Sequence, residues 1–224
     1  MGVRKFETMS PQVWLQAVAV MVLAVLLYSG LRSELPVDDV LRFTPAVAAG
    51  SYEWDSAHLL MQPSAVLWHR WLGFGAPART SQERFNAFCG GLSLAILYLL
   101  LLRLGVDLPR RILLTALGAL AFNQILLGTS GHFKLAVLPF LTLSLYHGVI
   151  WERSVRAEPG GGDGRLAASA IFLGVATAFL VNSILVAPFL GLAAAAISLR
   201  SGGGLRRAFK RLLGVGALSG GTAL

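Results

Sequence analysis

The chain has 224 residues, a formal net charge of +8, 55% hydrophobic residues and only 13% charged ones. A water-exposed surface does not tolerate so large an apolar fraction, so this composition excludes an ordinary soluble domain. The apolar residues form continuous blocks, and a block of about 17 to 25 residues crosses a bilayer as a helix. Backbone groups in lipid must be hydrogen-bonded internally, and the blocks do not alternate as barrel strands would. The sequence therefore predicts an all-α polytopic membrane protein.

The apolar blocks predict about six to seven transmembrane helices in a single transmembrane domain, residues 1–224. The blocks cover residues 11–31, 88–102, 111–128, 135–151, 166–199 and 212–224. The block 166–199 is too long for one helix, and Asn182 and Pro188 indicate a hairpin of two short helices. The last block is only the beginning of a seventh span, so we expect this chain to be the N-terminal part of a longer module.

Two polar segments interrupt the blocks. Residues 32–87 carry charges of both signs and are predicted to form the first extracytoplasmic loop. Residues 152–165 are Gly-rich and charged without an apolar period, which predicts a flexible cytoplasmic linker. The single cysteine, Cys89, excludes a disulfide within the chain and is expected to be a small buried residue.

The first loop contains two segments with apolar residues at helical spacing, residues 40–50 and 64–75. Arg, His and Trp lie among these apolar residues. Such segments fit amphipathic helices in the membrane interface, with Trp54, Trp68 and Trp71 at head-group depth.

The basic residues follow the positive-inside rule, under which short cytoplasmic loops collect Lys and Arg. With the N-terminus in the cytoplasm, most of the 19 basic residues are cytoplasmic: Arg4, Lys5, Arg103, Arg110, Arg111, Arg153, Arg156, Arg165, Arg200, Arg206, Arg207, Lys210 and Arg211. This pattern predicts a multi-pass protein of the cytoplasmic (plasma) membrane. It also explains the positive charge by topology, with membrane lipids as sufficient partners and no nucleic acid.

Asp38 and Asp39 lie a few residues beyond the first predicted helix, at the membrane surface. A carboxylate there can meet both a lipid-borne substrate and a water-soluble one. It could act as a general base on an acceptor hydroxyl, which makes the pair our candidate catalytic residues. The pair could instead hold a divalent cation through oxygen ligands, or be solvated loop residues.

Four further residues are candidates for substrate binding: Asp55, His58, His132 and Lys134. His58 lies close to Asp55 in sequence and could pair with a carboxylate or a phosphate. His132 and Lys134 belong to a second outer turn. Cations in that turn could neutralise a phosphate leaving group if the turn faces the first loop.

Three stretches, in chain order, resemble the GT-C superfamily of polytopic glycosyltransferases. WDSAHLLMQPSAVLWHRWLG, residues 54–73, is similar to a loop segment in which an acid and a His precede a Pro and an apolar-aromatic helix. Residues 122–153, FNQILLGTSGHFKLAVLPFLTLSLYHGVIWER, are similar to the third and fourth helices with their tight outer turn. Residues 172–200, FLGVATAFLVNSILVAPFLGLAAAAISLR, resemble the family's hairpin of two short helices enclosing a polar pair and a Pro.

The resemblance implies that the acid after the first helix, here Asp38 or Asp39, is the base or orients the substrate. It also implies a lipid-linked donor, a polyprenyl-phosphate sugar, and leaves a divalent cation open. The chain departs from the family at the second outer turn, where an acid and an aromatic are usual but His132 and Phe133 stand. A metal or acceptor role for that turn therefore does not follow from the resemblance.

Two functions are consistent with these patterns. The first is an integral-membrane glycosyltransferase that transfers a sugar from a polyprenyl-phosphate donor to an acceptor on the extracytoplasmic face. The alternative is a non-catalytic multi-pass membrane subunit or a transporter-like protein. A transporter needs ionisable residues inside its spans, and mid-span polar residues are few here. Gly90, Gly91, Gly118 and the Ala run 193–196 are expected to be small-residue helix contacts.

Overall fold

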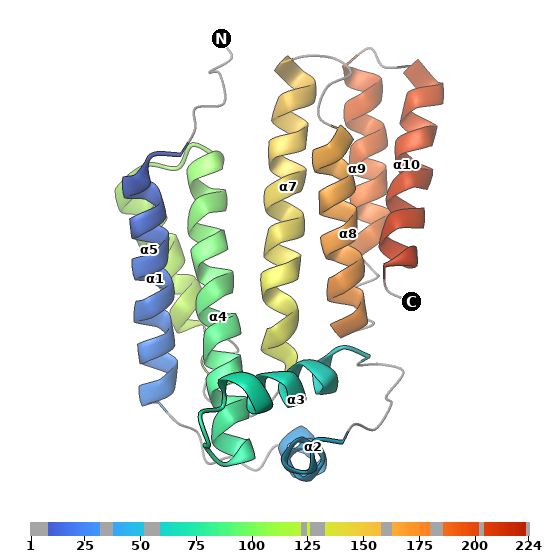
Figure 1. Cartoon of the computed structure of the whole chain (residues 1–224). Helices are drawn as coiled ribbons and strands as arrows, with labels where there is room; N and C mark the ends of the chain where they lie inside the picture. The colour runs from blue at the N-terminus through green and yellow to red at the C-terminus, as the bar shows by residue number, and fades with distance from the viewer. Residues whose placement is uncertain are drawn as a thin grey trace.

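A computed structural model describes residues 9–31, 38–51, 59–121, 125, 133–157, 163–179, 186–201 and 204–222 (Figure 1). In chain order the elements are α1 (Pro11–Gly30), α2 (Asp38–Ala49), α3 (Met61–Leu72), α4 (Ala78–Arg103), α5 (Leu108–Leu120), the short 3-10 helix η1 (Phe133–Val137), α7 (Leu138–Ala157), α8 (Asp163–Phe179), α9 (Val186–Arg200) and α10 (Gly204–Gly221). The predicted all-α fold is confirmed for this part of the chain.

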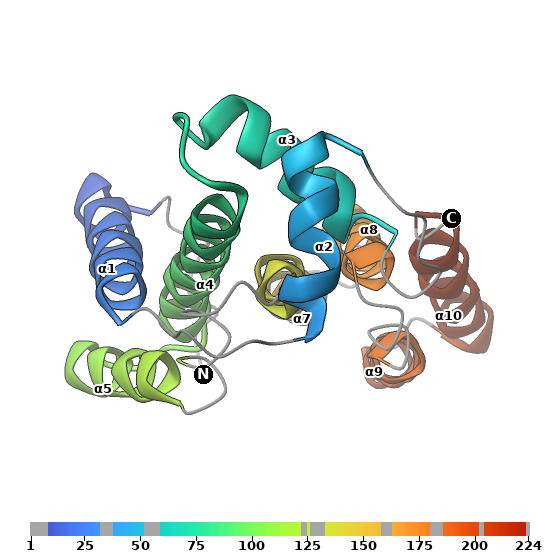
Figure 2. The same cartoon turned by 90° about the horizontal axis from the view of Figure 1, so that it is seen from below.

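The long helices pack side by side, while α2 and α3 lie across one end of them (Figure 1). Seen from that end, α1, α4, α7, α8 and α10 follow one another in a row, with α5 and α9 on one side of it (Figure 2). Each neighbouring pair in the row is in contact, and α4 also contacts α2, α3, α5 and η1. Helix α4 is therefore the element that joins the first helix to the rest of the molecule.

Three described stretches are long and apolar enough to cross a membrane, namely Pro11–Gly30, Ala78–Arg103 and Leu135–Arg156. Helix α1 buries only Ala17, Ala24 and Tyr28. Its other large apolar side chains, such as Leu15 and Leu23, are exposed. Exposed apolar residues in such numbers fit contact with lipid rather than with water. The three stretches indicate a membrane protein.

Helix boundaries differ from those that hydropathy predicted. Helix α5 covers Leu108–Leu120 where the apolar block was 111–128, and Ala121 lies outside the helix. Helix α4 begins at Ala78 rather than at 88, because its polar N-terminal turns pack against α3 and do not need to be apolar. Helix α7 continues to Ala157 and α8 begins at Asp163, so most of the predicted linker 152–165 is helical. The basic stretch between the last two apolar blocks, from Leu205 to Arg211, belongs to α10, which begins at Gly204.

Glycine ends two of the helices by the same backbone motif. Gly50 and Gly105 have positive φ angles of 65° and 79°, which cost glycine little because it has no Cβ. After α4, the N–H of Gly105 donates to the carbonyl of Leu102 and that of Val106 to the carbonyl of Leu101. These two bonds form a Schellman motif, which satisfies the last carbonyls of the helix. The chain can therefore reverse directly into α5.

Helices α1, α4 and α5 are joined by close packing and by two tyrosine hydroxyls. Tyr98 of α4 donates to Oε1 of Gln16 at 2.7 Å, and Tyr28 of α1 donates to the Ala119 carbonyl of α5 at 3.0 Å. A Cβ on Gly91 would lie 2.8 Å from the Met21 carbonyl oxygen, so α1 and α4 touch through the backbone there. The small-residue contact predicted at Gly91 is confirmed.

The two ends of the bundle differ in charge. The helix ends away from α2 and α3 carry a concentration of basic side chains: Arg103, Arg110, Arg111, Arg153, Arg156, Arg165, Arg200, Arg206, Arg207, Lys210 and Arg211. Arg111 is buried there and stacks over the Tyr98 ring, 4.6 Å from its centroid. The opposite end carries the two helices of the first loop.

Replacing Gly91 by Ala should destabilise the protein, because the added methyl group must push α1 away from α4. Overpacking of this kind costs about 1 to 3 kcal/mol. Gly118→Ala is the matched control, since its Cβ would meet only the flexible ends of Leu94 and Leu97 at 3.4 Å. Thermal unfolding in detergent should show a lower midpoint for Gly91→Ala than for Gly118→Ala. Equal midpoints would contradict the close approach of the two helices.

Candidate functional site at the α2–α3 end

The structure places two of the predicted site elements at this end. The backbone of Asp38 and Asp39 forms the first turn of α2, and the backbone of Lys134 lies in η1. The side chains of these three residues lie outside the described part of the chain. Asp55, His58 and His132 lie wholly outside it. Their predicted roles therefore stay predictions.

One apolar core holds α2 and η1 together. Phe43 and Val47 of α2 are buried in the same cluster as Ala136 and Val137 of η1. Further members of this cluster come from α3, α4 and α8: Met61, Ala65, Val66, Ala78, Phe85, Cys89, Ala176 and Phe179. Helix α2, which begins at Asp38 and Asp39, thus packs into the same core as η1, which carries Lys134.

A hydrogen bond fixes α2 on α4. The hydroxyl of Thr44 donates to Oε1 of Gln82 at 2.7 Å, and Gln82 is buried. Thr44 is six residues from the start of α2, so the bond holds the N-terminal half of the helix on α4. At the other end of α2, Gly50 and Ser51 donate to the Val47 and Ala46 carbonyls and close the helix.

Several buried polar atoms of α3 and of the first turns of α4 lack a hydrogen-bond partner among the described residues. They are both amide atoms of Gln62, Nε1 of Trp68, Nδ1 of His69, Oγ of Ser81 and Nε2 of Gln82. A buried polar group without a partner costs about 1 to 3 kcal/mol. Such groups gather at binding sites more readily than elsewhere, because a polar ligand or an ordered water can satisfy them. The end of the bundle that carries α2 therefore has unused hydrogen-bonding capacity.

Sequence reasoning missed this polar cluster because it treated residues 78–87 as loop. The helical spacing of the polar residues in this stretch could have revealed the cluster. Ser81, Gln82 and Asn86 are all buried and come before the apolar half of α4. Polar residues at positions i and i+4, followed without a break by an apolar block, indicate a helix whose first turns face a polar partner.

The aromatic residues of α3 divide between the core and the surface. Trp68 packs on α4, with its ring centroid 5.4 Å from that of Phe85 and 5.1 Å from that of Phe88. It is therefore a packing residue and not a free interfacial side chain. Trp71 is 73% exposed, and Phe74 just beyond the helix is 85% exposed. Trp71 thus fits the predicted interfacial role, and Phe74 is exposed close to it in sequence. Trp54, the third predicted anchor, lies outside the described residues.

The described residues contain no group of three or more His, Cys, Asp or Glu that could hold a metal ion. The acids and histidines predicted for this end lie outside that search. Arg70 of α3 and Arg84 of α4 are exposed at the same end and form no ion pair within the described chain. Arg79 pairs with Glu83 at 3.2 Å, one turn further along α4.

No family model matches the chain, and no curated protein and no solved structure matches it either. The resemblance to the GT-C superfamily, which was drawn from residues and their order, is therefore a prediction that these comparisons do not support.

Thr44→Val should destabilise the protein by about 1 to 2 kcal/mol, because the buried Gln82 amide loses its donor. Thr142→Val is the matched control, since the Thr142 hydroxyl donates only within its own helix, to the Leu138 and Pro139 carbonyls. Chemical unfolding in mixed micelles measures both. In a Gln82→Met background the effect of Thr44→Val should largely disappear. An undiminished effect in that background would show that the hydrogen bond does not hold α2 in place.

Proposed function

We propose that this protein is an integral-membrane glycosyltransferase of GT-C type. It transfers a sugar from a polyprenyl-phosphate donor to an acceptor on the extracytoplasmic face of the cytoplasmic membrane. The observation that carries the proposal is the placement of α2. This helix begins at Asp38 and Asp39, lies across one end of the bundle, and packs in one core with α3, α4 and η1 (Figure 1).

The arrangement supports the proposal because aromatic side chains that suit the lipid head-group region and polar groups that could bind a sugar lie at the same end of the bundle. Trp71 and Phe74 are exposed on and beside α3, where aromatic side chains fit the head-group region. The buried Gln62 amide of α3 and the buried Nε2 atom of Gln82 in α4 have no hydrogen-bond partner among the described residues and lie at the same end of the bundle. Hydroxyl-rich groups such as sugars form hydrogen bonds with amides of this kind.

In the proposed reaction, the carboxylate of Asp38 or Asp39 takes the proton of an acceptor hydroxyl. The acceptor oxygen forms a bond to the anomeric carbon of the sugar, and the bond from that carbon to the phosphate oxygen breaks. Polyprenyl phosphate leaves with the electron pair, and the configuration at the anomeric carbon inverts. General-base assistance of this kind contributes about 10² to 10⁴ in rate.

The phosphate that leaves gains negative charge, so cations near it lower the barrier. Lys134, His132 and His58 are the proposed cations. The exposed guanidinium groups of Arg70 and Arg84 are at the same end and can draw an anionic donor toward it.

The proposed orientation of the protein in the membrane rests on the distribution of its charged side chains. Basic side chains gather at the bundle end opposite to α2 and α3, and short cytoplasmic segments collect such residues. The end with α2 and α3 would then be extracytoplasmic, and the N-terminus cytoplasmic. A donor that is already activated and lipid-linked suits a face of the membrane that lacks nucleotides.

The orientation can be tested with single cysteines in a Cys89→Ala background. Ser51→Cys places an exposed thiol after α2, and Asp107→Cys places one at the opposite end. We expect a membrane-impermeant maleimide to label Ser51→Cys in intact cells and Asp107→Cys only after the membrane is permeabilised. The reverse pattern would invert the topology and move the proposed reaction to the cytoplasmic face.

Asp38→Asn and Asp39→Asn test the general base. Asn keeps the size of the side chain and also suits a helix start, so the helix should survive. Sugar transfer from labelled polyprenyl-phosphate donors in proteoliposomes should fall by about a hundredfold or more in one variant. Asp107→Asn, an exposed acid at the opposite end, is the control and should keep full activity. Absence of transfer by the unmodified protein with every donor would favour a non-catalytic membrane subunit. Equal, measurable rates in all variants would instead rule out Asp38 and Asp39 as the general base.

A further inference from the structure

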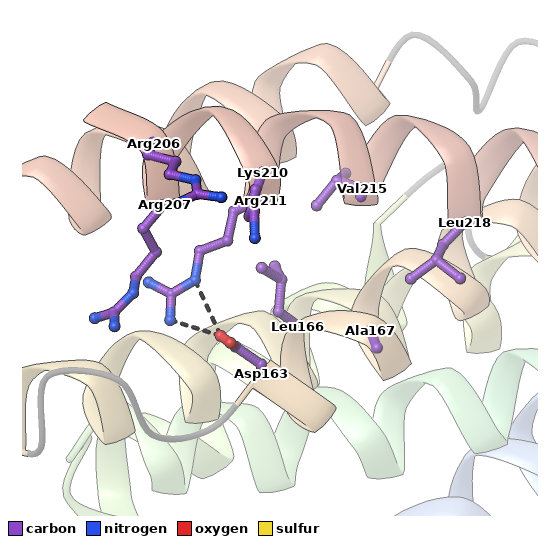
Figure 3. A pocket seen from close by; sticks show the side chains of 10 residues that line it. Asp163, Leu166, Ala167, Arg206, Arg207, Lys210, Arg211, Val215 and Leu218 are labelled. Atoms are coloured by element: carbon purple, nitrogen blue, oxygen red, sulfur yellow. Dashed lines mark hydrogen bonds and ion pairs between the residues drawn. The ribbon is translucent and has the colours of Figure 1, made fainter. Parts of the chain in front are cut away.

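A cavity of about 610 Å³ lies between α8 and α10, at the basic end of the bundle. Figure 3 shows the side chains of its basic part, Arg206, Arg207, Lys210 and Arg211, on the N-terminal half of α10. Asp163, at the start of α8, is the one acid that lines it. This cavity is at the opposite end of the molecule from the proposed catalytic site, so it is a separate feature.

Arg211 is the fixed member of the basic group. Its Nε and Nη2 atoms lie 3.0 and 2.5 Å from Oδ1 of Asp163, and its Nη1 donates to the Ser198 hydroxyl at 2.8 Å. The guanidinium also lies over the Trp151 ring, 5.2 Å from its centroid. Its side chain is 5% exposed. Arg211 and Asp163 thus neutralise each other and build one wall of the cavity.

The other three cations have no such partner. Arg206, Arg207 and Lys210 form no ion pair or hydrogen bond within the described part of the chain, and all three are exposed. Three like charges around one cavity repel one another and raise the local positive potential. Such a concave basic surface attracts an anion, and phosphate oxygens are the acceptors that Arg and Lys bind most readily.

The lining changes from charged to apolar along α10. The basic residues occupy positions 206 to 211, and Gly214, Val215 and Leu218 follow on the same side of the helix (Figure 3). Leu166 and Ala167 of α8 complete the apolar part. A phospholipid has the same order of groups, with phosphate at the membrane surface and acyl chains below it. A soluble phosphate ion would make no favourable contact with the apolar half of such a cavity.

We infer that the cavity between α8 and α10 binds an anionic phospholipid. The phosphodiester contacts Arg206, Arg207 and Lys210, and the first part of an acyl chain lies against Ala167, Gly214 and Leu218. Basic pockets between helices on the cytoplasmic side of membrane proteins bind anionic head groups in this way. The inference does not depend on the proposed glycosyltransferase activity.

The first experiment removes the charges. Native mass spectrometry of the full chain in detergent measures the affinity for dioleoylphosphatidylglycerol and, for comparison, dioleoylphosphatidylcholine. The triple variant Arg206→Gln, Arg207→Gln, Lys210→Gln should bind the anionic lipid at least about tenfold more weakly. The control triple Arg110→Gln, Arg153→Gln, Arg200→Gln removes the same charge from the same end but outside the cavity. It should bind within about twofold of the unmodified protein.

The second experiment keeps every charge and fills the cavity. Gly214 lines it, and a Cβ at Gly214 meets no atom within 4 Å, so Gly214→Phe can place its ring there without a backbone clash. Gly216→Phe is the matched control, because position 216 also has open space around its Cβ and does not line the cavity. Gly214→Phe should weaken binding of the anionic lipid about tenfold, and Gly216→Phe should leave it unchanged. Thermal unfolding of all four variants checks that they remain folded.

Three outcomes would overturn the inference. Equal weakening by the two triple variants would mean that the lipid responds only to the general charge of that end. Equal binding by Gly214→Phe and Gly216→Phe would mean that the cavity is not used. Displacement of the lipid by millimolar inorganic phosphate, with phosphate itself bound by the unmodified protein, would mean that the cavity takes a soluble anion.

Discussion

The packing of α4 against its neighbours is the constraint on which the rest of the structure depends. One helix contacts α1, α5 and α7 along its apolar half and α2, α3 and η1 along its polar first turns. The close approach at Gly91 and the Tyr98 hydroxyl hold α1 to α4, and the Tyr28 hydroxyl joins α1 to α5. In lipid, where burial of apolar surface gives helices little reason to associate, contacts of this kind determine which helices are neighbours.

The polar first turns of α4 determine where the two helices of the first loop, α2 and α3, lie. Because Gln82 accepts a hydrogen bond from Thr44, and because Trp68 packs on Phe85 and Phe88, α2 and α3 lie on the end of the bundle instead of extending into solvent. The backbone of Asp38 and Asp39 therefore belongs to a packed helix. The proposed general base needs such a backbone, since small displacements of a catalytic group reduce its rate strongly.

The two ends of the bundle carry different polar side chains, and the fold explains why basic residues gather at one end only. The last turns of α4, α7 and α9 and the first turns of α5, α8 and α10 all lie at one end, which gathers the basic residues (Figure 1). There, Arg211 is buried against Asp163, Ser198 and Trp151, and it shapes the cavity between α8 and α10. At the opposite end, the Gln62 amide and the Nε2 atom of Gln82 have no hydrogen-bond partner within the described part of the chain. A molecule with phosphate and hydrocarbon parts could thus interact with either end, but with different side chains.

The sequence by itself determined the helical class, the approximate position of most apolar helices and the asymmetric distribution of Lys and Arg, because continuous apolar blocks and charge counts are local properties of the chain. It also marked Asp38 and Asp39 as acids at the end of a span, and Gly91 as a contact residue. Only the tertiary structure decided that α4 begins at Ala78, that Gln62 and Gln82 are buried, that Trp68 faces the core, and that four basic residues of α10 line a cavity with Asp163. These features depend on which helix lies beside which, and residues far apart in the chain, such as Thr44 and Gln82 or Asp163 and Arg211, meet only when the helices pack.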